Sequence, residues 1–416
     1  MNKPVYGLLG RTLGHSYSPE IHALLGDTAY HCIELEPEEL EPFLKKQNIG
    51  GLNVTIPYKR DVLPFCDSYS SSVEQIGAAN TLVQENGTLK AYNTDKPGFM
   101  ELVRVSGIPV NGAKVLMLGS GGASRAVKAG LQDLGAREII TISRSGENNY
   151  QNLDRHYADT DVIVNTTPVG MYPKCIASPL SLKEFTKLKG VLDIVYNPAR
   201  TGLMLQAEEL GIPHASGLLM LVAQAVKSHE LFFHTTVPDG TIENITARLQ
   251  TDAENIVLAG MPGSGKTTIA QELGKITGKE VIDIDEEIVK SSGRSIPDIF
   301  ASEGETAFRD LESEQIARVG AMSGKIISLG GGAVLREENY LPLHQNGRIY
   351  VLNRDLSLLG MEGRPLSRNR ETLEHMWEDR KSRYERFADK QIANDGTPEQ
   401  AASEIWEDFK VALGQL

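Results

Sequence analysis

The stretch Ile256-Val-Leu-Ala-Gly260-Met-Pro-Gly-Ser-Gly265-Lys266-Thr267-Thr decides the fold of the C-terminal part of the chain. Its apolar start predicts a buried strand, and the glycine-rich run leads into a helix-forming segment. In this context the loop amides can surround phosphate groups, Lys266 can reach the β- and γ-oxygens, and the Thr267 hydroxyl can ligate Mg²⁺. The sequence therefore predicts an α/β domain with a P-loop that binds ATP and Mg²⁺. The predicted nucleotide contacts are Gly260, Gly263, Ser264, Gly265, Lys266, Thr267 and Thr268.

A second glycine turn lies nearer the N-terminus, between a predicted strand, Val115–Leu118, and a predicted helix that ends near Leu134. With the next strand, Ile139–Ile142, it forms a βαβ unit of the dinucleotide-binding type. That strand ends in Arg144, where NAD-specific folds usually carry an acidic residue, and an Arg there suits the 2′-phosphate of NADP. The predicted NADP(H) contacts are Gly119, Ser120, Gly121, Gly122, Ala123, Ser143 and Arg144.

The order of predicted strands and helices divides the 416 residues into several α/β domains. Residues 1–100 are expected to form a first domain, completed by an apolar helix at 217–233 that has no strand partner of its own. Residues 101–216 form the dinucleotide-binding domain. A polar linker with a short helix is expected at 234–254, and the P-loop domain at 255–416.

Composition excludes several classes of protein. The formal charge of −13 argues against a nucleic-acid partner, since phosphate-backbone binding needs clustered Lys and Arg. No apolar run approaches the roughly 20 residues that span a bilayer, so no membrane association is expected. Cys32, Cys66 and Cys175 are too far apart in sequence to indicate a disulfide framework or a zinc cluster. The start of the chain runs directly into the strand Val5–Leu9 without a basic, apolar leader, so we expect a cytoplasmic protein.

Four motifs in the N-terminal half occur in the order and spacing of shikimate dehydrogenases. They are Gly10-Arg-Thr-Leu-Gly14-His-Ser16-Tyr-Ser18-Pro19, Asn53-Val-Thr55-Ile-Pro57-Tyr-Lys59, Gly77-Ala-Ala-Asn80-Thr81 and Asn93-Thr94-Asp95. The resemblance covers about residues 1–233 and continues in Asn165-Thr-Thr-Pro168, Asp193-Ile-Val-Tyr196-Asn-Pro198 and Gly217-Leu-Leu-Met-Leu-Val-Ala-Gln224. It implies reduction of 3-dehydroshikimate to shikimate with NADPH.

By this resemblance Lys59 and Asp95 form the catalytic pair, and Gly217 lies beside the cofactor. A Lys next to an Asp can supply the proton that the carbonyl oxygen needs as hydride arrives. The residues implied to hold the substrate are Ser16, Ser18, Thr55, Asn80, Tyr196 and Gln224. One departure from the family is visible: only 20 residues separate Arg144 from Asn165, so a strand or helix of the cofactor domain is expected to be trimmed there.

The C-terminal half resembles shikimate kinases from about residue 256 to 395. The motifs are Ile282-Asp283-Ile-Asp285, Gly293-Arg-Ser-Ile296, Gly304-Glu-Thr-Ala-Phe308-Arg309, Glu312, Gly330-Gly-Gly-Ala333, Arg364-Pro-Leu366 and Arg380 with Tyr384. The implied product is shikimate 3-phosphate. The fold class expected for the whole chain is thus a substrate domain, a Rossmann-type domain and a P-loop domain like that of nucleoside monophosphate kinases.

The kinase resemblance also implies roles for single residues. Asp285 would hold and polarise the attacking hydroxyl while Asp283 approaches Mg²⁺ through water, and both are expected to point the same way from the end of one strand. The forked donors of Arg309 and Arg380 suit the carboxylate of the substrate. The remaining implied contacts are Gly331 and Gly332 near the ring and Arg364 on a lid at the transferring phosphoryl group.

The residues favour a bifunctional enzyme of the shikimate pathway, with two alternatives. One keeps both folds and changes the substrates, giving a quinate/shikimate-type dehydrogenase fused to a kinase of another small polyol acid. In the other, one half is catalytically inactive and regulatory. The catalytic residues of both halves argue against inactivity, since all of them are present: Lys59, Asp95, Lys266, Asp285, Arg309 and Arg364.

The single Arg at the end of the second dinucleotide strand predicts a modest preference for NADP over NAD. Arg144 supplies one charge-assisted contact and no further basic residue follows, so the preference in kcat/KM should be roughly ten- to a hundredfold, or about 1–3 kcal/mol. Steady-state kinetics with both cofactors, in wild type and Arg144→Ala, measures it. Equal kcat/KM for both cofactors, unchanged in the variant, would remove the basis for the assignment.

Overall fold

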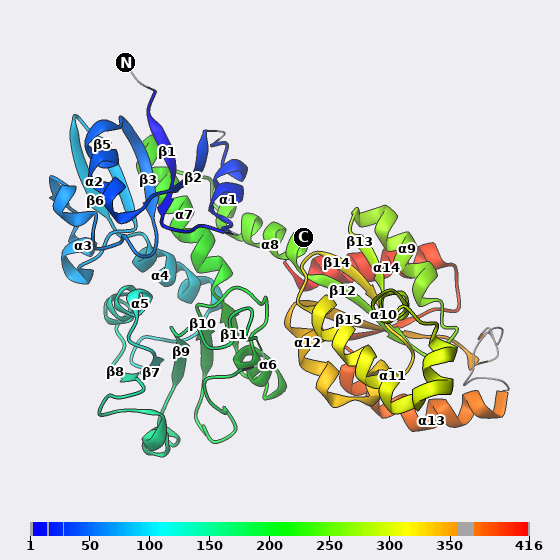
Figure 1. Cartoon of the computed structure of the whole chain (residues 1–416). Helices are drawn as coiled ribbons and strands as arrows, with labels where there is room; N and C mark the ends of the chain where they lie inside the picture. Colours follow the sequence, from blue (N-terminus) through cyan, green and yellow to red (C-terminus); the bar gives the residue numbers. More distant parts are fainter. Residues whose placement is uncertain are drawn as a thin grey trace. The chain divides into compact units, whose positions relative to one another are not determined.

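The computed structural model describes residues 3–14, 16–27, 29–175, 177–356, 359 and 370–414, except the side chains of 370–372. Backbone contacts divide the chain into two compact units. The N-terminal unit consists of Met1–Val169, Pro179–Tyr196 and Gln206–Thr246, and the C-terminal unit of Gly170–Ser178, Asn197–Leu205 and Ala247–Leu416. The expected α/β class is confirmed by three sheets, which are parallel or mixed and are flanked by helices (Figure 1).

The first sheet of the N-terminal unit has six strands in the order β2-β1-β3-β5-β6-β4. Strands β2, β1 and β3 pair in parallel, and β5 is antiparallel to β3. A hairpin of β5 and β6 turns through Asn86 and Gly87, both at positive φ, as expected for an Asn-Gly turn. Its strands are β1 (Val5–Gly10), β2 (Tyr30–Glu34), β3 (Ile49–Val54), β4 (Ser68–Tyr69), β5 (Thr81–Glu85) and β6 (Thr88–Tyr92). Its helices are α1 (Ser18–Leu24), α2 (Pro37–Lys46), α3 (Ser71–Ile76) and α4 (Asp95–Ser106).

The second sheet is parallel, with the order β11-β10-β9-β7-β8. Its elements are β7 (Lys114–Leu118), α5 (Gly122–Asp133), β8 (Glu138–Ile142), β9 (Val162–Asn165), β10 (Gly190–Asp193), α6 (Gly202–Glu209) and β11 (His214–Ser216). Between β8 and β9 the chain forms only the short 3₁₀ helix η2 (Tyr150–His156), and β8 lies at the sheet edge. The short spacing before Asn165 thus holds one short helix, and trimming relative to the family stays a prediction.

The apolar helix α7 (Leu218–Phe233) packs back on the first sheet, as expected. It contacts β3 and α1, and in Figure 1 it lies in green against the blue N-terminal elements. Buried polar groups fix this contact, since the Asn53 side-chain amide on β3 donates to the Ser228 hydroxyl on α7 at 2.7 Å. The return of α7 therefore places residues that are far apart in sequence at one end of the sheet.

The C-terminal unit is built on a third, parallel sheet with the order β13-β14-β12-β15-β16. The strands are β12 (Asn255–Gly260), β13 (Glu280–Asp283), β14 (Lys325–Ser328), β15 (Gly347–Asn353) and β16 (Lys390–Ala393). The longer helices are α9 (Lys266–Thr277), α10 (Ile284–Ser292), α11 (Ile296–Gly320), α13 (Arg370–Phe387) and α14 (Pro398–Ala412). The expected linker carries helix α8 (Thr241–Ala253), which is longer than the short helix expected there.

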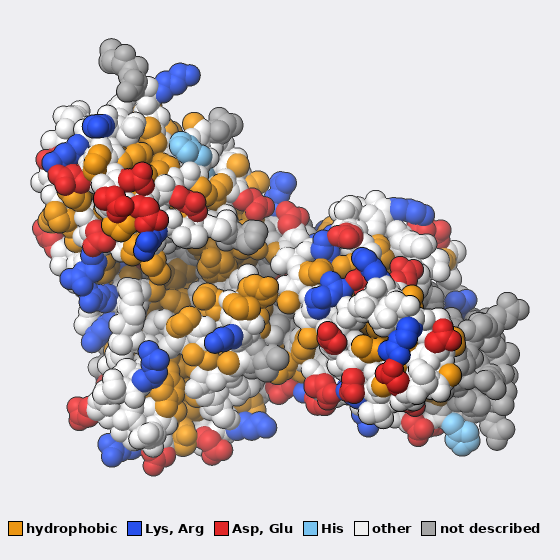
Figure 2. All heavy atoms as spheres, in the orientation of Figure 1, with side chains coloured by type: hydrophobic (Ala, Val, Ile, Leu, Met, Phe, Trp, Pro, Cys, Tyr) orange, Lys and Arg blue, Asp and Glu red, His pale blue; other side chains and the backbone are white. Residues whose placement is uncertain are grey.

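Acidic and basic side chains are interspersed on the face that Figure 2 shows. No helix in the described part of the chain is long and apolar enough to cross a membrane.

A buried arginine holds one internal segment in the C-terminal unit. Arg200 is 5% exposed, and its guanidinium pairs with Asp389 at 2.9 Å and donates to the carbonyl oxygens of His344 and Gly347. The backbone N–H of Arg200 also donates to the carbonyl oxygen of Gln345. The domain boundaries expected from the sequence stay a prediction, but the segment Asn197–Leu205 groups with the C-terminal unit by these contacts.

Removing this arginine should destabilise the C-terminal unit. Arg200→Ala leaves Asp389 buried without its cation, which typically costs about 3–5 kcal/mol. Both tryptophans, Trp377 and Trp406, lie in this unit, so their fluorescence during urea unfolding of the whole chain reports on it. The control is Arg248→Ala, because Arg248 lies in the same unit, is 63% exposed and lies 3.8 Å from its acidic partner, Asp252. Equal midpoints for the two variants would show that the buried pair contributes nothing.

Candidate active sites

The first candidate site is a cavity of about 310 Å³ in the N-terminal unit. It lies at the ends of β1 and β3 and is closed on one side by α7. It contains all eight residues predicted to bind or act on the substrate, and also Gly217. These are Ser16, Ser18, Thr55, Lys59, Asn80, Asp95, Tyr196 and Gln224. Thr12, Asn53 and Met220, which were not predicted, also line it.

Lys59 and Asp95 form an ion pair at the cavity wall. The Lys59 ammonium donates to Asp95 Oδ2 at 2.6 Å, with the two side chains 27% and 14% exposed. Asp95 is the first residue of α4, where the helix N-terminus favours a carboxylate. The amide nitrogen of Asn80 donates to Asp95 Oδ1 at 3.0 Å, so both carboxylate oxygens are held. The pair is therefore oriented before any substrate arrives.

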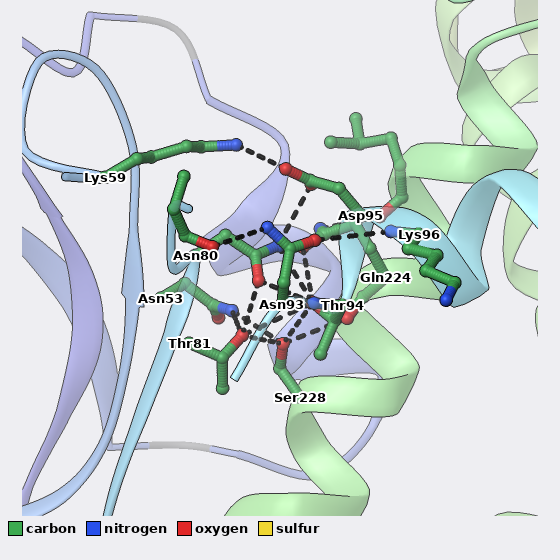
Figure 3. A network of polar contacts seen from close by, with 12 residues as sticks. Asn53, Lys59, Asn80, Thr81, Asn93, Thr94, Asp95, Lys96, Gln224 and Ser228 are labelled. Carbon is green, nitrogen blue, oxygen red and sulfur yellow. Dashed lines mark hydrogen bonds and ion pairs between the residues drawn. The ribbon is translucent and has the colours of Figure 1, made fainter. Parts of the chain in front are cut away.

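A buried polar network supports this pair from below (Figure 3). Thr94 donates its backbone N–H to Asn80 Oδ1 at 2.7 Å, and the hydroxyls of Thr81, Thr94 and Ser228 lie 2.9–3.3 Å from one another. Asn53 donates to Ser228 at the far side. Three of these residues fall inside motifs quoted above without an assigned role, whereas nothing in the sequence marked Ser228.

The glycine turn between β7 and α5 is open where a dinucleotide would lie. A Cβ on Gly121 or Gly122 would meet nothing within 4 Å, whereas one on Gly119 would lie 2.8 Å from Thr167. The backbone at Gly119, at φ +100°, therefore packs against the Thr166-Thr167 loop, and the next two glycines leave room for a pyrophosphate at the helix N-terminus. Ser120 and Ala123 belong to the same turn, and Ser143 and the exposed Arg144 follow β8. These positions fit NADP(H).

The second candidate site is a cavity of about 790 Å³ in the C-terminal unit. It lies at the carboxyl ends of β12, β13 and β14. The predicted residues that line it are Gly263, Gly265, Lys266, Thr267, Thr268, Asp283, Asp285, Arg309, Gly331, Gly332 and Arg380. Gly260 and Ser264 belong to the same loop, and Arg364 lies outside the described residues.

The P-loop has the backbone conformation that phosphate binding requires. Gly260, Gly263 and Gly265 all lie at positive φ, where a side chain would be strained. The Lys266 ammonium donates to the carbonyl oxygens of Gly260 and Met261, at 2.9 and 3.0 Å, and so lies over the loop. The Thr267 hydroxyl donates to Asp283 Oδ2 at 3.2 Å. This hydroxyl and carboxylate are oxygen donors of the kind that Mg²⁺ prefers, so the residues fit the ion.

The expected arrangement of the two aspartates on one strand end is wrong. Asp283 ends β13 and caps α10, accepting the backbone N–H of Asp285, which is already in the first turn of that helix. Both side chains still line the cavity, because the helix turns Asp285 back toward it. The sequence pattern could not show that the strand ends at Asp283, because this last strand residue is also the cap of the helix that follows.

Two carboxylate oxygens point into this cavity without partners. Among the described residues, Asp285 Oδ1 and Glu312 Oε1 are buried and have no hydrogen-bond partner, and a Cβ on Gly330 would lie 3.1 and 2.5 Å from them. Burial and the negative charge of Asp283 raise the pKa of Asp285, against the opposing charges of Lys266 and Arg309. Burial likewise raises the pKa of Glu312. Buried acceptors of this kind suit the hydroxyl groups of a polyol.

Two arginines lie beside these acids. Arg309 pairs with Glu312 at 2.7 Å, and its guanidinium lies so close to Gly332 that a Cβ there would overlap it. Arg380 and the Tyr384 hydroxyl both donate to the carbonyl oxygen of Gly331, at 3.0 and 2.6 Å. A Cβ on Gly331 would also lie 2.8 Å from Pro262, so the glycine run packs closely against its neighbours, and its role near the substrate ring stays a prediction. Arg354, which also lines the cavity, was not predicted.

These two sites define the class of the protein: a dinucleotide-dependent dehydrogenase joined to a P-loop phosphotransferase. Residues 8–82 match the family described as "Shikimate dehydrogenase substrate binding domain", and residues 262–410 match "Shikimate kinase". The chain belongs to the shikimate dehydrogenase family over its N-terminal part and carries a shikimate kinase domain after it. The resemblances seen in the sequence are thereby confirmed.

Individual relatives cover the dehydrogenase part almost completely. The shikimate dehydrogenase (NADP(+)) of Caldicellulosiruptor bescii is 38% identical over 253 residues, which is 54% of this chain and 88% of that protein. That of Clostridium perfringens strain SM101 is 35% identical over 59% of this chain and 98% of the relative. A crystal structure of a chorismate mutase/shikimate 5-dehydrogenase fusion protein from Clostridium acetobutylicum is 33% identical, with a TM-score of 0.56 over 60% of this chain and 98% of that one.

The raised pKa of Asp285 gives a stability difference that depends on pH. The pKa of Asp285 is higher in the folded than in the unfolded protein, so the folded state binds the proton more tightly. The wild-type protein therefore loses unfolding free energy as the pH rises from the unfolded-state pKa of Asp285 through its folded-state pKa. Asp285→Asn lacks this loss, so above the folded pKa it should exceed wild type in unfolding free energy. The gain should be about 1.4 kcal/mol per unit of pKa shift and vanish in acid. Urea unfolding followed by tryptophan fluorescence at several pH values measures it; a difference that does not change with pH would contradict the assignment.

Proposed function

We propose that the N-terminal unit reduces 3-dehydroshikimate to shikimate with NADPH, and that the C-terminal unit phosphorylates shikimate to shikimate 3-phosphate with ATP and Mg²⁺. The observation that carries the proposal is that each cavity brings together the functional groups that its reaction needs. The N-terminal unit has a cavity with an oriented Lys–Asp pair and carries an open glycine turn. The cavity of the C-terminal unit holds a P-loop, two carboxylate oxygens without hydrogen-bond partners and two arginines. The three cysteines are free and both cosubstrates are abundant in the cytoplasm, where we place the enzyme.

In the dehydrogenase half, Lys59 is proposed to give a proton to the carbonyl oxygen of the substrate. Its ammonium is held by Asp95, which directs it along the cavity wall. Asn80 fixes the other carboxylate oxygen of Asp95, so the donor does not reorient during the reaction. Ser16, Ser18, Thr55 and Gln224 offer hydroxyl and amide groups to the substrate in the same cavity.

NADPH supplies the hydride when it is bound. The glycine turn from Gly119 to Gly122 would hold its pyrophosphate and Arg144 its 2′-phosphate. Support comes from a solved relative: a crystal structure of the Thermus thermophilus shikimate 5-dehydrogenase in complex with NADP(H) and shikimate is 29% identical, with a TM-score of 0.53 over 59% of this chain and 99% of that one.

In the kinase half, Asp285 is proposed to accept a hydrogen bond from the attacking hydroxyl and to polarise it. Its Oδ1 atom and Glu312 Oε1 are the buried carboxylate oxygens of this cavity that have no hydrogen-bond partner among the described residues. Arg309 and Arg380 would bind the carboxylate, and Lys266 the phosphates. Thr267 and Asp283 would hold Mg²⁺, which supplies charge neutralisation at the phosphates. Arg364 keeps the lid role implied by the resemblance.

Paired variants should remove the two activities separately. Lys59→Ala should abolish NADP⁺ reduction by shikimate and leave ATP-dependent phosphorylation within about twofold. Asp285→Asn, which keeps the shape and removes the charge, should lower the kinase kcat by about 10²-fold or more with nearly constant ATP affinity. Each variant is the control for the other, and both activities are measured on the whole chain. Loss of both activities in a folded single variant would contradict independent sites; near-wild-type kinase turnover in Asp285→Asn, with loss in Asp283→Asn, would reverse the two aspartate roles.

A further inference from the structure

Two histidines and an aspartate meet in the N-terminal unit, away from the Lys–Asp pair. The Nδ1 atoms of His22 on α1 and His229 on α7 lie 2.7 and 2.9 Å from Asp27 Oδ2. The side chains of His22, His229 and Asp27 are 0%, 12% and 7% exposed. One ligand atom from each lies within 4.8 Å of the others, and no other such group occurs in the described residues. The proposed dehydrogenase and kinase reactions use none of the three.

The backbone at the end of α1 builds one half of this cluster. The chain turns at Gly26, at φ +95°, so that the backbone N–H of Asp27 donates to the carbonyl oxygen of His22 at 2.8 Å. The Asp27 carboxylate is thereby folded back toward the His22 ring, which also stacks on Tyr30 at 3.8 Å between centroids. These two ligands are placed by local structure, and α7 brings the third.

The hydrogen-bond network assigns the proton of His22 to its other nitrogen. His22 Nε2 lies 3.1 Å from the side-chain oxygen of Asn53, which also accepts the Tyr30 hydroxyl. The amide orientation of Asn53 is fixed because its NH₂ group donates to Ser228, whose own proton goes to the carbonyl oxygen of Gln224. Facing an acceptor, Nε2 must carry the hydrogen. In the neutral ring, the Nδ1 lone pair then points at the carboxylate of Asp27.

The lone pairs of His22 Nδ1 and Asp27 Oδ2 would repel each other at 2.7 Å, so a cation is needed between the two atoms. The candidates are a second proton on the buried His22 ring or a metal ion. A metal satisfies His22 and His229 at once, since both Nδ1 atoms converge on the same carboxylate oxygen. The Nε2–H to carbonyl bond of His22 is the outer contact that metal-bound histidines usually make. Ligand atoms on a tetrahedral ion at about 2.0 Å lie about 3.3 Å apart, so the cluster needs to open by about half an ångström.

We propose that His22, Asp27 and His229 bind one divalent transition-metal ion of the Zn²⁺ type. Two imidazole nitrogens and one carboxylate oxygen suit such an ion and disfavour Mg²⁺, which prefers oxygen ligands. The ion joins α1 to α7, and both helices contribute to the substrate cavity, through Ser18 and Gln224. Its role is structural, and it is distinct from the Mg²⁺ site in the C-terminal unit.

Metal binding is tested on the whole chain. The protein is stripped with a chelator and titrated with Zn²⁺ by calorimetry in the presence of excess Mg²⁺, which occupies the kinase site. Co²⁺ is then added in place of Zn²⁺, and its visible absorption reports tetrahedral ligation. We expect one ion per chain, an intense Co²⁺ band and a higher thermal unfolding midpoint with Zn²⁺, followed by circular dichroism.

Matched variants distinguish Zn²⁺ binding at this cluster from Zn²⁺ binding by other side chains of the protein. His229→Gln and the isosteric Asp27→Asn should weaken Zn²⁺ affinity by about tenfold or more, the effect of losing one contact at a metal site. His31→Gln should leave the affinity unchanged, because His31 is exposed on β2 and contacts only the carbonyl oxygen of Ala29 among the bonds found. Circular dichroism and thermal unfolding of the metal-free protein confirm that each variant is folded.

Three results would overturn the proposal: no Zn²⁺ binding near one per chain, binding that His229→Gln and Asp27→Asn leave unchanged, or binding abolished by His31→Gln or by replacing Cys32. In the first case the cation at His22 is a proton, and the cluster is a hydrogen-bonded imidazolium–carboxylate group. If one of the two ligand variants fails to fold, the other decides.

Discussion

The dinucleotide turn and the kinase site depend on the fact that a covered parallel sheet leaves only its strand ends for polar chemistry. Every residue of β7, β9, β10 and β12 is buried, so their side chains are committed to packing. Polar groups can gather where these strands end and helices begin, and there the backbone turns through Gly119 and Gly260. The dinucleotide turn and the P-loop are two uses of this constraint, and the acids and arginines of the kinase cavity gather at the same kind of edge.

Local patterns were enough to predict much of the molecule. The strands at β1, β7, β8 and β12, the Asn86-Gly87 hairpin and the return of α7 follow from apolar runs and turn residues alone. The residues of both cavities came from motifs whose members lie far apart in the sequence, such as Lys59 with Asp95. These motifs could be read because each has fixed residue types at fixed spacing. The structure shows that the described motif residues of each half line the cavity of that half, while their catalytic roles stay predictions.

What the sequence could not show depends on contacts between distant segments. Ser228 looks like any serine of an apolar helix, yet it links Asn53 to the threonines beneath Asp95. Arg200 follows a strand of the dehydrogenase half by sequence, but its buried pair with Asp389 groups its segment with the C-terminal unit. Asp285 was expected at a strand end, but β13 ends at Asp283 and helix α10 begins at Ile284. For Ser228 and Arg200 a tertiary partner decides the position, whereas for Asp285 the local helix cap at Asp283 does.

One measurement tests most directly whether a single chain carries out both consecutive steps. The purified protein is supplied with 3-dehydroshikimate, NADPH, ATP and Mg²⁺, and NADPH oxidation, ADP release and the products are followed together. The two-site account predicts shikimate 3-phosphate as the end product, with one NADPH oxidised and one ADP released for each molecule formed. Accumulation of shikimate without ADP release, or no oxidation of NADPH, would contradict it.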